Sequence, residues 1–350
     1  MKILNIIDIP WFSGVTSYAV DSARGLSKRG HEIFFAGVRG GEPLKIAEKV
    51  GFKTVEVCSR KNPFILRSAF NLSKLIDAER IDIVNAHTGN AHFMAYLASL
   101  FTSQKFALVR TKSDVMRPKK SFLYGRTEKI IAASELIRKK YLEIGVAPSK
   151  VVTVYQGIEL PQAGTEACLP ANSVVGMLGR LDPVKGHRYF LASAAEVLEK
   201  NPVVKFLIAG KEENIRYREL ERMASEKGIS GAVKFCGFVG DAAGFMDGCS
   251  LGVIASTGSE AVSRVLLEWM SRGRAVVATG VGCIPEILPG DFVVPPSDPV
   301  SMAGTILSLL RDPEGLKIAG RNNREIAAER FGFEKFIDGT EKIFLEALER

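Results

Sequence analysis

The sequence lacks the features that mark several other classes of protein. It contains no apolar run long enough to span a bilayer, and its first residues, MKILNIIDIPW, have the pattern of a buried strand rather than of a secretion signal. No two cysteines are spaced C-x-x-C, and their number is odd: they are Cys58, Cys168, Cys236, Cys249 and Cys283. We therefore expect a cytoplasmic protein in a reducing compartment, without a structural zinc site.

What the sequence does contain is enough apolar material for two α/β domains. The chain has 350 residues, of which 46% are hydrophobic. In the first half, short apolar runs alternate with amphipathic stretches, which is the pattern of a parallel sheet covered by helices on both faces. The strands are expected at 2–7, 32–37, 54–57, 81–86, 106–111, 129–133 and 151–155, and the helices between them include 15–29, 63–79 and 134–144.

A break in this alternation separates the two domains. Residues 157–172, GIELPQAGTEACLPAN, hold two prolines and two glycines and are predicted to be a linker. Strands are then expected at 173–178, 204–209, 233–236, 251–255, 275–279 and 292–294, and helices at 186–200, 214–227, 263–272, 298–311 and 313–330. The fold predicted is α/β, with two doubly wound, Rossmann-like domains facing each other across a cleft. One covers 1–160 with an amphipathic C-terminal helix at 333–350 that packs back on it, and the other covers 172–332.

A pair of basic residues follows the first strand of the second domain. In the segment MLGRLDPVKGH, the strand ends at Gly179, and Arg180 and Lys185 lie in the loop before the next helix. Ligands of doubly wound sheets bind beyond the carboxyl ends of the strands, and two cations in one such loop can converge on one anion. Arg180 and Lys185 are therefore candidates for binding a phosphate, although two solvated surface cations would give the same pattern.

Two carboxylates flank a predicted helix start in GSEAVSRVLLEWMSRGRAVVATG. The first N–H groups of this helix, near Ser263, Arg264 and Val265, have no partner within the helix, and together with the helix dipole they form a seat for an anion. Glu260, before that seat, could accept hydrogen bonds from sugar hydroxyls, and Glu268, two turns into the helix, could accept them from a ribose diol. The alternative is that Glu260 only complements the helix dipole and that Glu268 is solvated.

Three further loops follow strand ends. Ser13 and Gly14 lie between the first strand and a helix start, where backbone N–H groups could approach a phosphate. His87 follows the strand at 81–86, although a capping or structural histidine fits that position as well. Gly282 follows the strand at 275–279 in a G-x-G pattern, which is weak evidence by itself.

Taken together, these motifs resemble the family 4 retaining glycosyltransferases of GT-B fold over most of the chain. The resemblance is carried by Ser13-Gly14, Gly30-His31-Glu32, Ala86-His87, VYQGIE at 154–159, Gly179-Arg180 with Lys185-Gly186, IAG at 208–210, FCG at 235–237, and Glu260-x7-Glu268. The pair G-R-x-x-x-x-K-G and E-x7-E is its most specific part. The chain departs from the family at AVS after Glu260, where G-F-G is usual, and at Trp269, where Ala is usual, so that the identity of the donor stays open.

The resemblance implies a role for each candidate in the second domain. That domain would bind a nucleotide-diphosphate sugar as donor substrate, with no cofactor, and its diphosphate would lie on Arg180, Lys185 and the helix start at 263–265. Glu260 would hold the donor sugar, and Glu268 would hold the ribose. Arg264 could add a third cation to the diphosphate or contact an acidic sugar.

The resemblance also assigns residues of the first domain. Gly14, with Ser13, would close on the donor phosphates, and His87 would contact the donor sugar near the reacting carbon. The first domain would hold the acceptor. The expected catalytic residues are His87, Arg180, Lys185 and Glu260, and the expected donor-binding residues are Ser13, Gly14, Arg180, Lys185, Glu260, Ser263, Arg264, Val265, Glu268 and Gly282.

Release of the nucleotide puts negative charge on its diphosphate, which either a metal ion or fixed cations and helix N–H groups can stabilise. The sequence contains no D-x-D motif and no cluster of His, Asp and Glu with the spacing of metal ligands. We therefore expect metal-independent transfer that depends on Arg180, Lys185 and the helix at 263. The resemblance implies retention through a short-lived oxocarbenium-like state, with the leaving phosphate helping to deprotonate the acceptor.

The basic residues of the chain are concentrated in its first half. Residues 1–160 hold 25 Lys and Arg against 14 Asp and Glu, whereas 161–350 hold 22 against 25. The segment 105–126 has seven Lys and Arg, one acid, and the run Phe122-Leu123-Tyr124. This composition favours an anionic membrane surface or a phosphorylated glycolipid over a solvated loop, and no nucleic-acid module is recognisable. By resemblance the acceptor would be a lipid-linked or cell-surface glycan such as a lipopolysaccharide core, which leaves a peripheral position at the inner face of the cytoplasmic membrane open.

Two other functions remain open at this point. A nucleotide-sugar epimerase can use the same fold, but it would need acid and base groups around the sugar, for which only His87 is an obvious candidate. A non-catalytic subunit that binds sugar nucleotides would not need the full set of Arg180, Lys185, Glu260 and Glu268.

Overall fold

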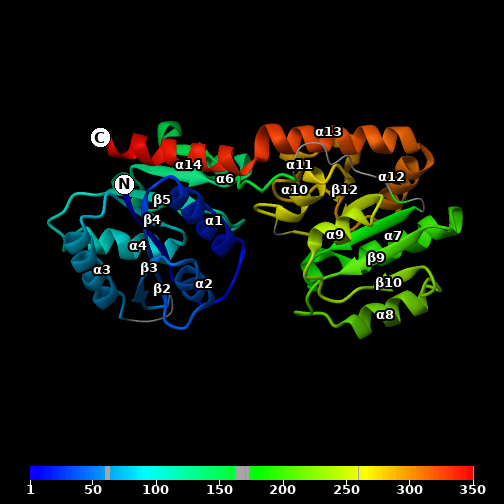
Figure 1. Cartoon of the computed structure of the whole chain (residues 1–350), viewed down its shortest axis with the longest axis horizontal. Helices are drawn as coiled ribbons and strands as arrows, with labels where there is room; N and C mark the ends of the chain where they lie inside the picture. Colours follow the sequence, from blue (N-terminus) through cyan, green and yellow to red (C-terminus); the bar gives the residue numbers. More distant parts are fainter. Residues whose placement is uncertain (60–63, 162–169, 171–172, 259, 350) are drawn as a thin grey trace. The chain divides into compact units, whose positions relative to one another are not determined.

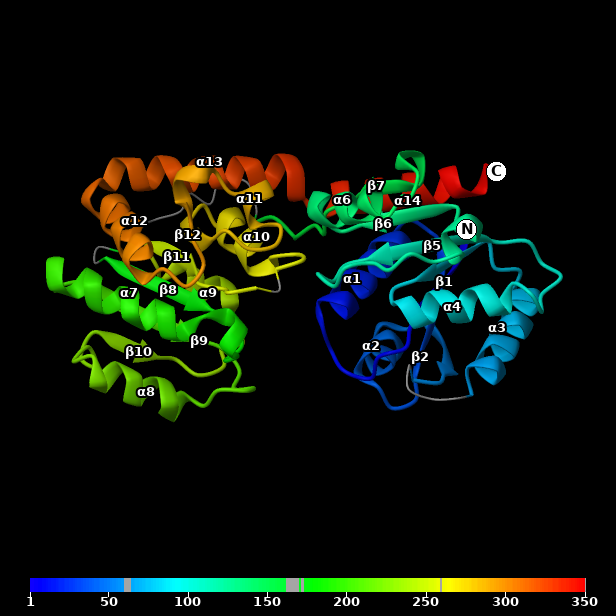
Figure 2. The ribbon, with the colours of Figure 1, turned by 180° about the vertical axis from the view of Figure 1, so that it is seen from behind.

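The computed structural model describes residues 1–59, 64–161, 170, 173–258 and 260–349, which form two compact units (Figures 1 and 2). Unit 1 is Met1–Gly157 with Phe333–Arg350, and unit 2 is Ile158–Gly332. The first part of unit 1 ends at Gly157, three residues before the domain end that the sequence predicts at 160. Most of the expected linker, 157–172, lies outside the described residues.

The sheet of unit 1 is entirely parallel, with the strand order β3-β2-β1-β4-β5-β6-β7. Its strands are β1 (Lys2–Ile7), β2 (Glu32–Val38), β3 (Lys53–Val57), β4 (Ile83–Ala86), β5 (Ala107–Lys112), β6 (Lys129–Ala132) and β7 (Val151–Thr153). Its helices are α1 (Gly14–Lys28), α2 (Glu42–Val50), α3 (Ile65–Glu79), α4 (Gly89–Ala98), α5 (Leu123–Arg126), α6 (Glu135–Glu143) and α14 (Phe333–Leu348), with a 3-10 turn at Pro148–Lys150.

Helices cover both faces of this sheet because apolar residues occupy both faces of its strands. Leu4 and Ile6 of β1 belong to a core cluster that includes residues of α3 and α4. Ile7 of β1 belongs to another cluster, with residues of α1 and α2. Successive side chains of a strand point to opposite faces, so that a continuous apolar strand requires cover on both sides.

Unit 2 repeats this architecture with a parallel sheet of order β10-β9-β8-β11-β12-β13. Its strands are β8 (Val174–Leu178), β9 (Lys205–Ala209), β10 (Val233–Phe235), β11 (Leu251–Ile254), β12 (Ala275–Thr279) and β13 (Val293–Val294). Its helices are α7 (His187–Lys200), α8 (Tyr217–Glu226), α9 (Ala242–Asp247), α10 (Arg264–Ser271), α11 (Ile284–Ile287), α12 (Pro299–Arg311) and α13 (Pro313–Phe331), with 3-10 turns at Pro183–Lys185 and Gly290–Phe292. The two sheets confirm the predicted doubly wound α/β class.

Some helices have no amphipathic pattern in the sequence and were not predicted. The clearest is α4, GNAHFMAYLA, which is apolar around most of its circumference. It is held between the sheet, α3 and α5, so that little of it needs a polar face. The short helix α9 has too few residues to establish a period of 3.6.

The C-terminal helix α14 packs on unit 1, against α1, β5 and β6 (Figure 1). Phe336 meets the ring of Tyr18 edge to face, with centroids 4.8 Å apart. Arg29, at the end of α1, pairs with three carboxylates of α14, among them Glu341 at 2.7 Å. Within the part of the chain that the structure describes, none of the helices combines the length and apolar character needed to cross a bilayer.

Trp269, an unusual residue for the family resembled, is accommodated by glycines beneath it. The side chain is fully buried on α10 and lies against Gly176 of β8 and Gly252 of β11, which are register partners in adjacent strands. A Cβ atom at Gly252 would come within 2.5 Å of the indole ring. Two positions without side chains thus provide the volume that the larger residue on the helix requires.

Candidate functional site

The order of the strands in unit 2 reverses between β8 and β11. From β8 the chain continues outward to β9 on one side, and from β11 it continues to β12 on the other. The loops after these two adjacent strands therefore diverge and leave a crevice at the carboxyl ends of the strands, which is where doubly wound folds bind ligands. The loop after β8 carries Arg180 and Lys185, and the loop after β11 carries Glu260.

Lys185 and Glu260, which are 75 residues apart in sequence, form an ion pair at this point. The Nζ atom of Lys185 lies 2.7 Å from Oε1 of Glu260, and the hydroxyl of Ser256 donates to the same oxygen at 2.6 Å. The Glu260 side chain is only 5% exposed, whereas that of Lys185 is 23% exposed. The buried carboxylate is thus fixed by two donors, and the cation keeps a part of its surface available for a ligand.

Gly186 allows the loop after β8 to lie directly on the end of β11. Its φ is +75°, and a Cβ atom there would lie 1.9 Å from the carbonyl oxygen of Ala255. The neighbouring Thr257 donates its backbone N–H to the carbonyl of Val184 at 2.8 Å. Only glycine fits this left-handed, closely approached position, which brings Lys185 to Glu260.

Gly282 likewise allows the loop after β12 to lie directly on the backbone of Glu260. Its φ is +58°, and a Cβ atom there would lie 1.9 Å from the backbone carbonyl oxygen of Glu260. That oxygen accepts a hydrogen bond from the N–H of Cys283 at 2.8 Å. The structure therefore places Gly282 against the main chain of Glu260, and its expected role in donor binding stays a prediction.

Three residues that support this cluster were not selected from the sequence: Ser256, Asp182 and Asn214. Ser256 holds Glu260, as described above. Asp182 caps the 3-10 turn that carries Lys185, accepting from Val184 N–H at 2.9 Å and from the Asn214 amide at 2.6 Å. Burial opposes ionisation of Asp182, but these donors and the nearby Arg180 and Lys185 outweigh it and lower its pKa. All three follow strand ends, a signal that could have found them.

The other three expected charged residues of unit 2, Arg180, Arg264 and Glu268, all form ion pairs. Arg180 pairs through Nη1 with Glu213 at 2.8 Å, and both side chains are about half exposed. Arg264 pairs through Nε with Glu268 at 2.8 Å, one turn along α10. Exposed pairs of this kind contribute little to stability, so that an anionic ligand could displace either carboxylate partner at small cost.

The start of α10 lies immediately after Glu260 in the chain. Ser263 is at the N-cap position, but its side chain makes no capping hydrogen bond. The first helical bond runs from the N–H of Leu267 to the carbonyl of Ser263 at 3.2 Å, so that the N–H of Val265 precedes the hydrogen-bonded part of the helix. The backbone N–H of Ser263 donates to the thiol of Cys283. Among the described residues, no cluster of three His, Cys, Asp or Glu has the arrangement of metal ligands.

Unit 1 has its own reversal of strand order, between β1 and β4, and a pocket lies there. The pocket has a volume of about 500 Å³. Ser13 lines it from the loop after β1, and Gly14 begins α1 beside it. We call this cavity the β1–β4 pocket; Asp8, Trp11, Thr88, Asn90, Arg110 and Lys112 are among its lining residues.

His87 lies at the end of β4 and is completely buried within unit 1. Its Nε2 atom is 2.9 Å from Oδ1 of Asn5 and 3.1 Å from Nδ2 of Asn85. Burial, with a smaller effect of Arg110, lowers the pKa of His87 to about 3, so that the imidazole is neutral at pH 7. Its expected contact with the donor sugar stays a prediction.

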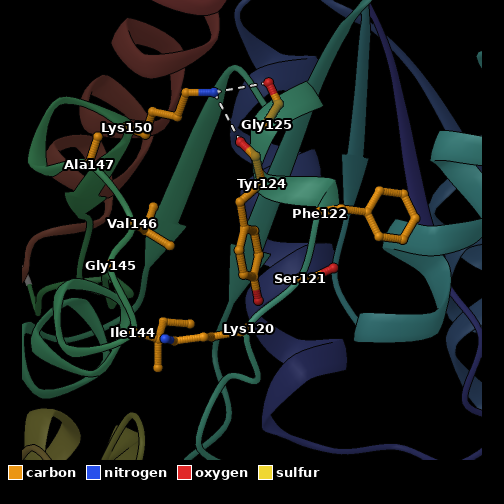
Figure 3. A pocket seen from close by; sticks show the side chains of 10 residues that line it. All are labelled: Lys120, Ser121, Phe122, Tyr124, Gly125, Ile144, Gly145, Val146, Ala147 and Lys150. Carbon is orange, nitrogen blue, oxygen red and sulfur yellow. Dashed lines mark hydrogen bonds between the residues drawn. The ribbon is translucent and has the colours of Figure 1, made fainter.

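The basic segment 105–126 contributes to three pockets. Residues within 110–124 line the β1–β4 pocket, and residues within 120–125 line a neighbouring pocket of about 600 Å³ between 120–125 and 144–150 (Figure 3). The two ends of the segment, 105–107 and Arg126, line a third pocket. Figure 3 shows Phe122 pointing away from this second pocket, whereas Tyr124 lies within it; the Nζ of Lys150 donates to the carbonyl of Tyr124 at 3.0 Å. Phe122 is 69% exposed.

Each of the two units has a parallel, doubly wound sheet, and polar loops lie where its strand order reverses. This architecture defines a protein of the GT-B class. Residues 12–162 match the family described as Glycosyltransferase Family 4, and residues 172–312 match Glycosyl transferases group 1. The chain belongs to the family 4 glycosyltransferases and is an enzyme that transfers glycosyl groups.

Relatives of known name support this membership. The chain is 27% identical over 336 residues to a phosphatidyl-myo-inositol mannosyltransferase of Mycolicibacterium smegmatis, covering 88% of this chain and 83% of the relative. It is 23% identical to an N-acetyl-alpha-D-glucosaminyl L-malate synthase of Bacillus anthracis, covering 99% and 97%.

Solved structures share the fold over nearly the whole chain. Anabaena HepE, in complex with UDP, superposes with a TM-score of 0.84 at 20% identity, covering 98% of this chain and 99% of that one. The lipopolysaccharide outer core galactosyltransferase WaaB has a TM-score of 0.79 at 16% identity, with 99% of both chains covered.

Proposed function

We propose that this enzyme transfers a sugar from a nucleotide-diphosphate sugar to a lipid-linked or cell-surface glycan, for example a lipopolysaccharide core, with retention of configuration and without a metal ion. The observation that carries the proposal is the contact of Lys185 with Glu260 at the point where the strand order of unit 2 reverses. HepE of the same fold was solved with UDP and with UDP-glucose, which supports a nucleotide sugar as donor.

The charges of this site suit a diphosphate next to a sugar. Lys185 would hold the phosphates together with the N–H groups at the start of α10, while Glu260 would accept from hydroxyls of the donor sugar. Among the described residues, the second carboxylate oxygen of Glu260, Oε2, has no hydrogen-bond partner, which leaves an acceptor for such a hydroxyl. Binding would release Arg180 from Glu213 and turn it towards the phosphates.

In the proposed reaction, the bond between the anomeric carbon and the diphosphate oxygen breaks, and a bond to the acceptor oxygen forms on the same face of the sugar. The electron pair of the breaking bond goes to the diphosphate, where Lys185, Arg180 and the N–H groups of α10 stabilise the negative charge. The acceptor hydroxyl gives its proton to a leaving phosphate oxygen. Because no residue becomes covalently attached, the residues act by position and charge.

The acceptor would bind to unit 1, which carries the basic excess of the chain. The relatives named for phosphatidyl-myo-inositol mannosyl transfer and for lipopolysaccharide outer core galactosyl transfer support a lipid-linked or cell-surface acceptor. The exposed Phe122 within the basic segment supports a peripheral position at an anionic membrane.

A thermal-shift screen of nucleotides and nucleotide sugars tests the donor site. A donor at about 100 times its dissociation constant should add about 2.7 kcal/mol to the stability of the protein. We expect Lys185→Ala and Glu268→Ala each to abolish the shift. Lys205→Ala, which changes an exposed lysine at the opposite end of β9, is the matched control and should keep the shift. Full donor binding in both site variants would contradict the assignment.

Product analysis separates the alternatives. An epimerase would change the sugar of the donor without any acceptor, and a non-catalytic binding subunit would bind the donor but neither transfer nor hydrolyse it. The proposed enzyme should instead hydrolyse the donor slowly in the absence of acceptor, and the rate should not change when EDTA is added.

A further inference from the structure

The β1–β4 pocket of unit 1 contains two cations that the proposed donor chemistry does not use. Arg110 and Lys112 alternate along β5, so that both side chains project from the same face of the sheet. Their residues are only 4% and 6% exposed, and both line the pocket. Charged residues are rarely buried to this degree unless a counter-charge is present.

The partners of the Arg110 guanidinium in the described part of the chain are backbone carbonyls rather than carboxylates. Its Nη1 atom donates to the backbone carbonyls of Ala86, at 2.8 Å, and of Thr111. Among the residues that the structure describes, no carboxylate lies within ion-pair distance of this guanidinium. Carbonyl oxygens satisfy hydrogen bonds but do not neutralise the charge, so that Arg110 remains a buried cation.

Lys112 pairs with one carboxylate, that of Asp114, and a single negative charge cannot balance both Lys112 and Arg110. Its Nζ atom pairs with Asp114, whose carboxylate also accepts the N–H of Met116 at 2.9 Å. Burial lowers the pKa of Lys112 and the proximity of Arg110 lowers it further, although Asp114 opposes both effects. The two like charges therefore destabilise each other.

The remaining charges of the pocket leave it with a positive excess. Lys119 and Arg117 are exposed lining residues, and Arg117 pairs with Glu143 at 3.0 Å. The carboxylate of Asp8 already accepts from Thr88 and, at 2.8 Å, from the Asn90 amide. His92 adds no charge, because burial lowers its pKa to about 3. An anionic group bound between Arg110 and Lys112 would balance these cations.

We propose that the β1–β4 pocket binds the acceptor by an anionic group, a phosphate or a carboxylate, that lies between Arg110 and Lys112. Trp11, which is 48% exposed, lies on the wall of the pocket and offers a flat apolar face to a sugar ring. The acceptor substrate is thus an acidic or phosphorylated sugar. This assignment rests on the proposed function, since it names the acceptor of the same enzyme.

The test uses three sugars that differ only at carbon 6: glucose 6-phosphate, glucuronate and glucose. Each is titrated into the full chain, with and without saturating UDP, while tryptophan fluorescence is recorded. Trp11 lies in the pocket, and the only other tryptophan, Trp269, is buried in unit 2, so that Trp11→Phe should abolish the signal. We expect saturable binding of at least one anionic sugar, with glucose at least about tenfold weaker. Tighter binding of glucose 6-phosphate than of glucuronate would indicate a phosphate as the natural group, and the reverse order would indicate a carboxylate.

Substitutions link the signal to the two cations. Arg110→Gln and Lys112→Gln should each weaken the anionic probe by about ten- to a hundredfold, which corresponds to one charge-assisted hydrogen bond. Lys129→Gln, which removes another buried lysine of unit 1 outside the pocket, should leave the affinity unchanged. If Arg110→Gln does not fold, Lys112→Gln still decides.

Binding of glucose as tight as that of the anionic sugars would overturn the assignment, as would full affinity in the two glutamine variants. The two proposals fail differently. Loss of UDP binding contradicts the donor site of unit 2, whereas UDP binding without any response to the anionic sugars contradicts only the pocket.

Discussion

At the scale of single residues, the candidate site depends on one buried carboxylate and its two donors. Lys185 and Ser256 both bind Oε1 of Glu260. The lysine supplies charge to the site as well as holding Glu260, whereas the serine only holds it. The two donors should therefore differ in what their loss does to catalysis.

We predict that Ser256→Ala lowers kcat/KM about tenfold or less, whereas Lys185→Ala lowers it by about a hundred- to a thousandfold. The first change removes one hydrogen bond that positions Glu260, and the second removes the cation that, in the proposed reaction, stabilises the departing phosphate. Steady-state kinetics with a donor and acceptor pair found by product analysis gives both numbers. A larger loss for Ser256→Ala than for Lys185→Ala would contradict this order.

At the scale of elements, glycines decide how closely the loops of unit 2 approach. We predict that Gly186→Ala destabilises the protein by about 2 kcal/mol or more, because the alanine must adopt a left-handed conformation and its Cβ meets the carbonyl of Ala255. Urea unfolding measures the change. Gly231→Ala, at a glycine with open space around its Cβ position, is the control and should change the stability little.

The packing of α10 on the sheet gives a second prediction at this scale. Trp269→Ala should destabilise the protein by about 3–5 kcal/mol, since it leaves a cavity above Gly176 and Gly252 that a backbone cannot fill. The double variant that also replaces Gly252 by Ala should recover a part of this loss, because the added methyl enters the vacated space. Thermal or urea unfolding checks both, and a neutral effect of Trp269→Ala would contradict the packing account.

At the scale of the whole molecule, three buried histidines link stability to pH. Burial lowers the pKa of His87 and His92 to about 3 and that of His187 to about 4, against an ordinary value of 6.5. Between these values the unfolded chain binds protons that the folded chain does not. The neutral histidines therefore make their full contribution to the free energy of unfolding above pH 6.5. This contribution falls as the pH drops towards 4, by about 1.4 kcal/mol per pH unit for each histidine.

Urea midpoints measured between pH 7 and pH 4 test this linkage. His187→Asn should reduce the slope by about 1.4 kcal/mol per pH unit, even if it also lowers the stability at pH 7. A slope unchanged by this substitution would mean that His187 is protonated in the folded protein.

Much of the candidate site could be predicted because its motifs follow strand ends. An apolar strand followed by a polar loop is a local pattern, and it was sufficient to select Lys185, Glu260 and the helix start at Ser263. Arg180 and Glu268 were selected in the same way, but the structure gives each a partner of its own, Glu213 and Arg264. Which charges meet cannot be read from the local pattern.

The sequence by itself determined two doubly wound domains, because the alternation of apolar strands and amphipathic helices is written in consecutive residues. Only the tertiary structure decided that β8 lies beside β11 and β1 beside β4. That order of strands brings Lys185 to Glu260, and it places Arg110 and Lys112 at the same pocket as Asp8. The physical reason is that strand order depends on how distant segments bury one another, so that residues far apart in the chain become neighbours only when both sheets have formed.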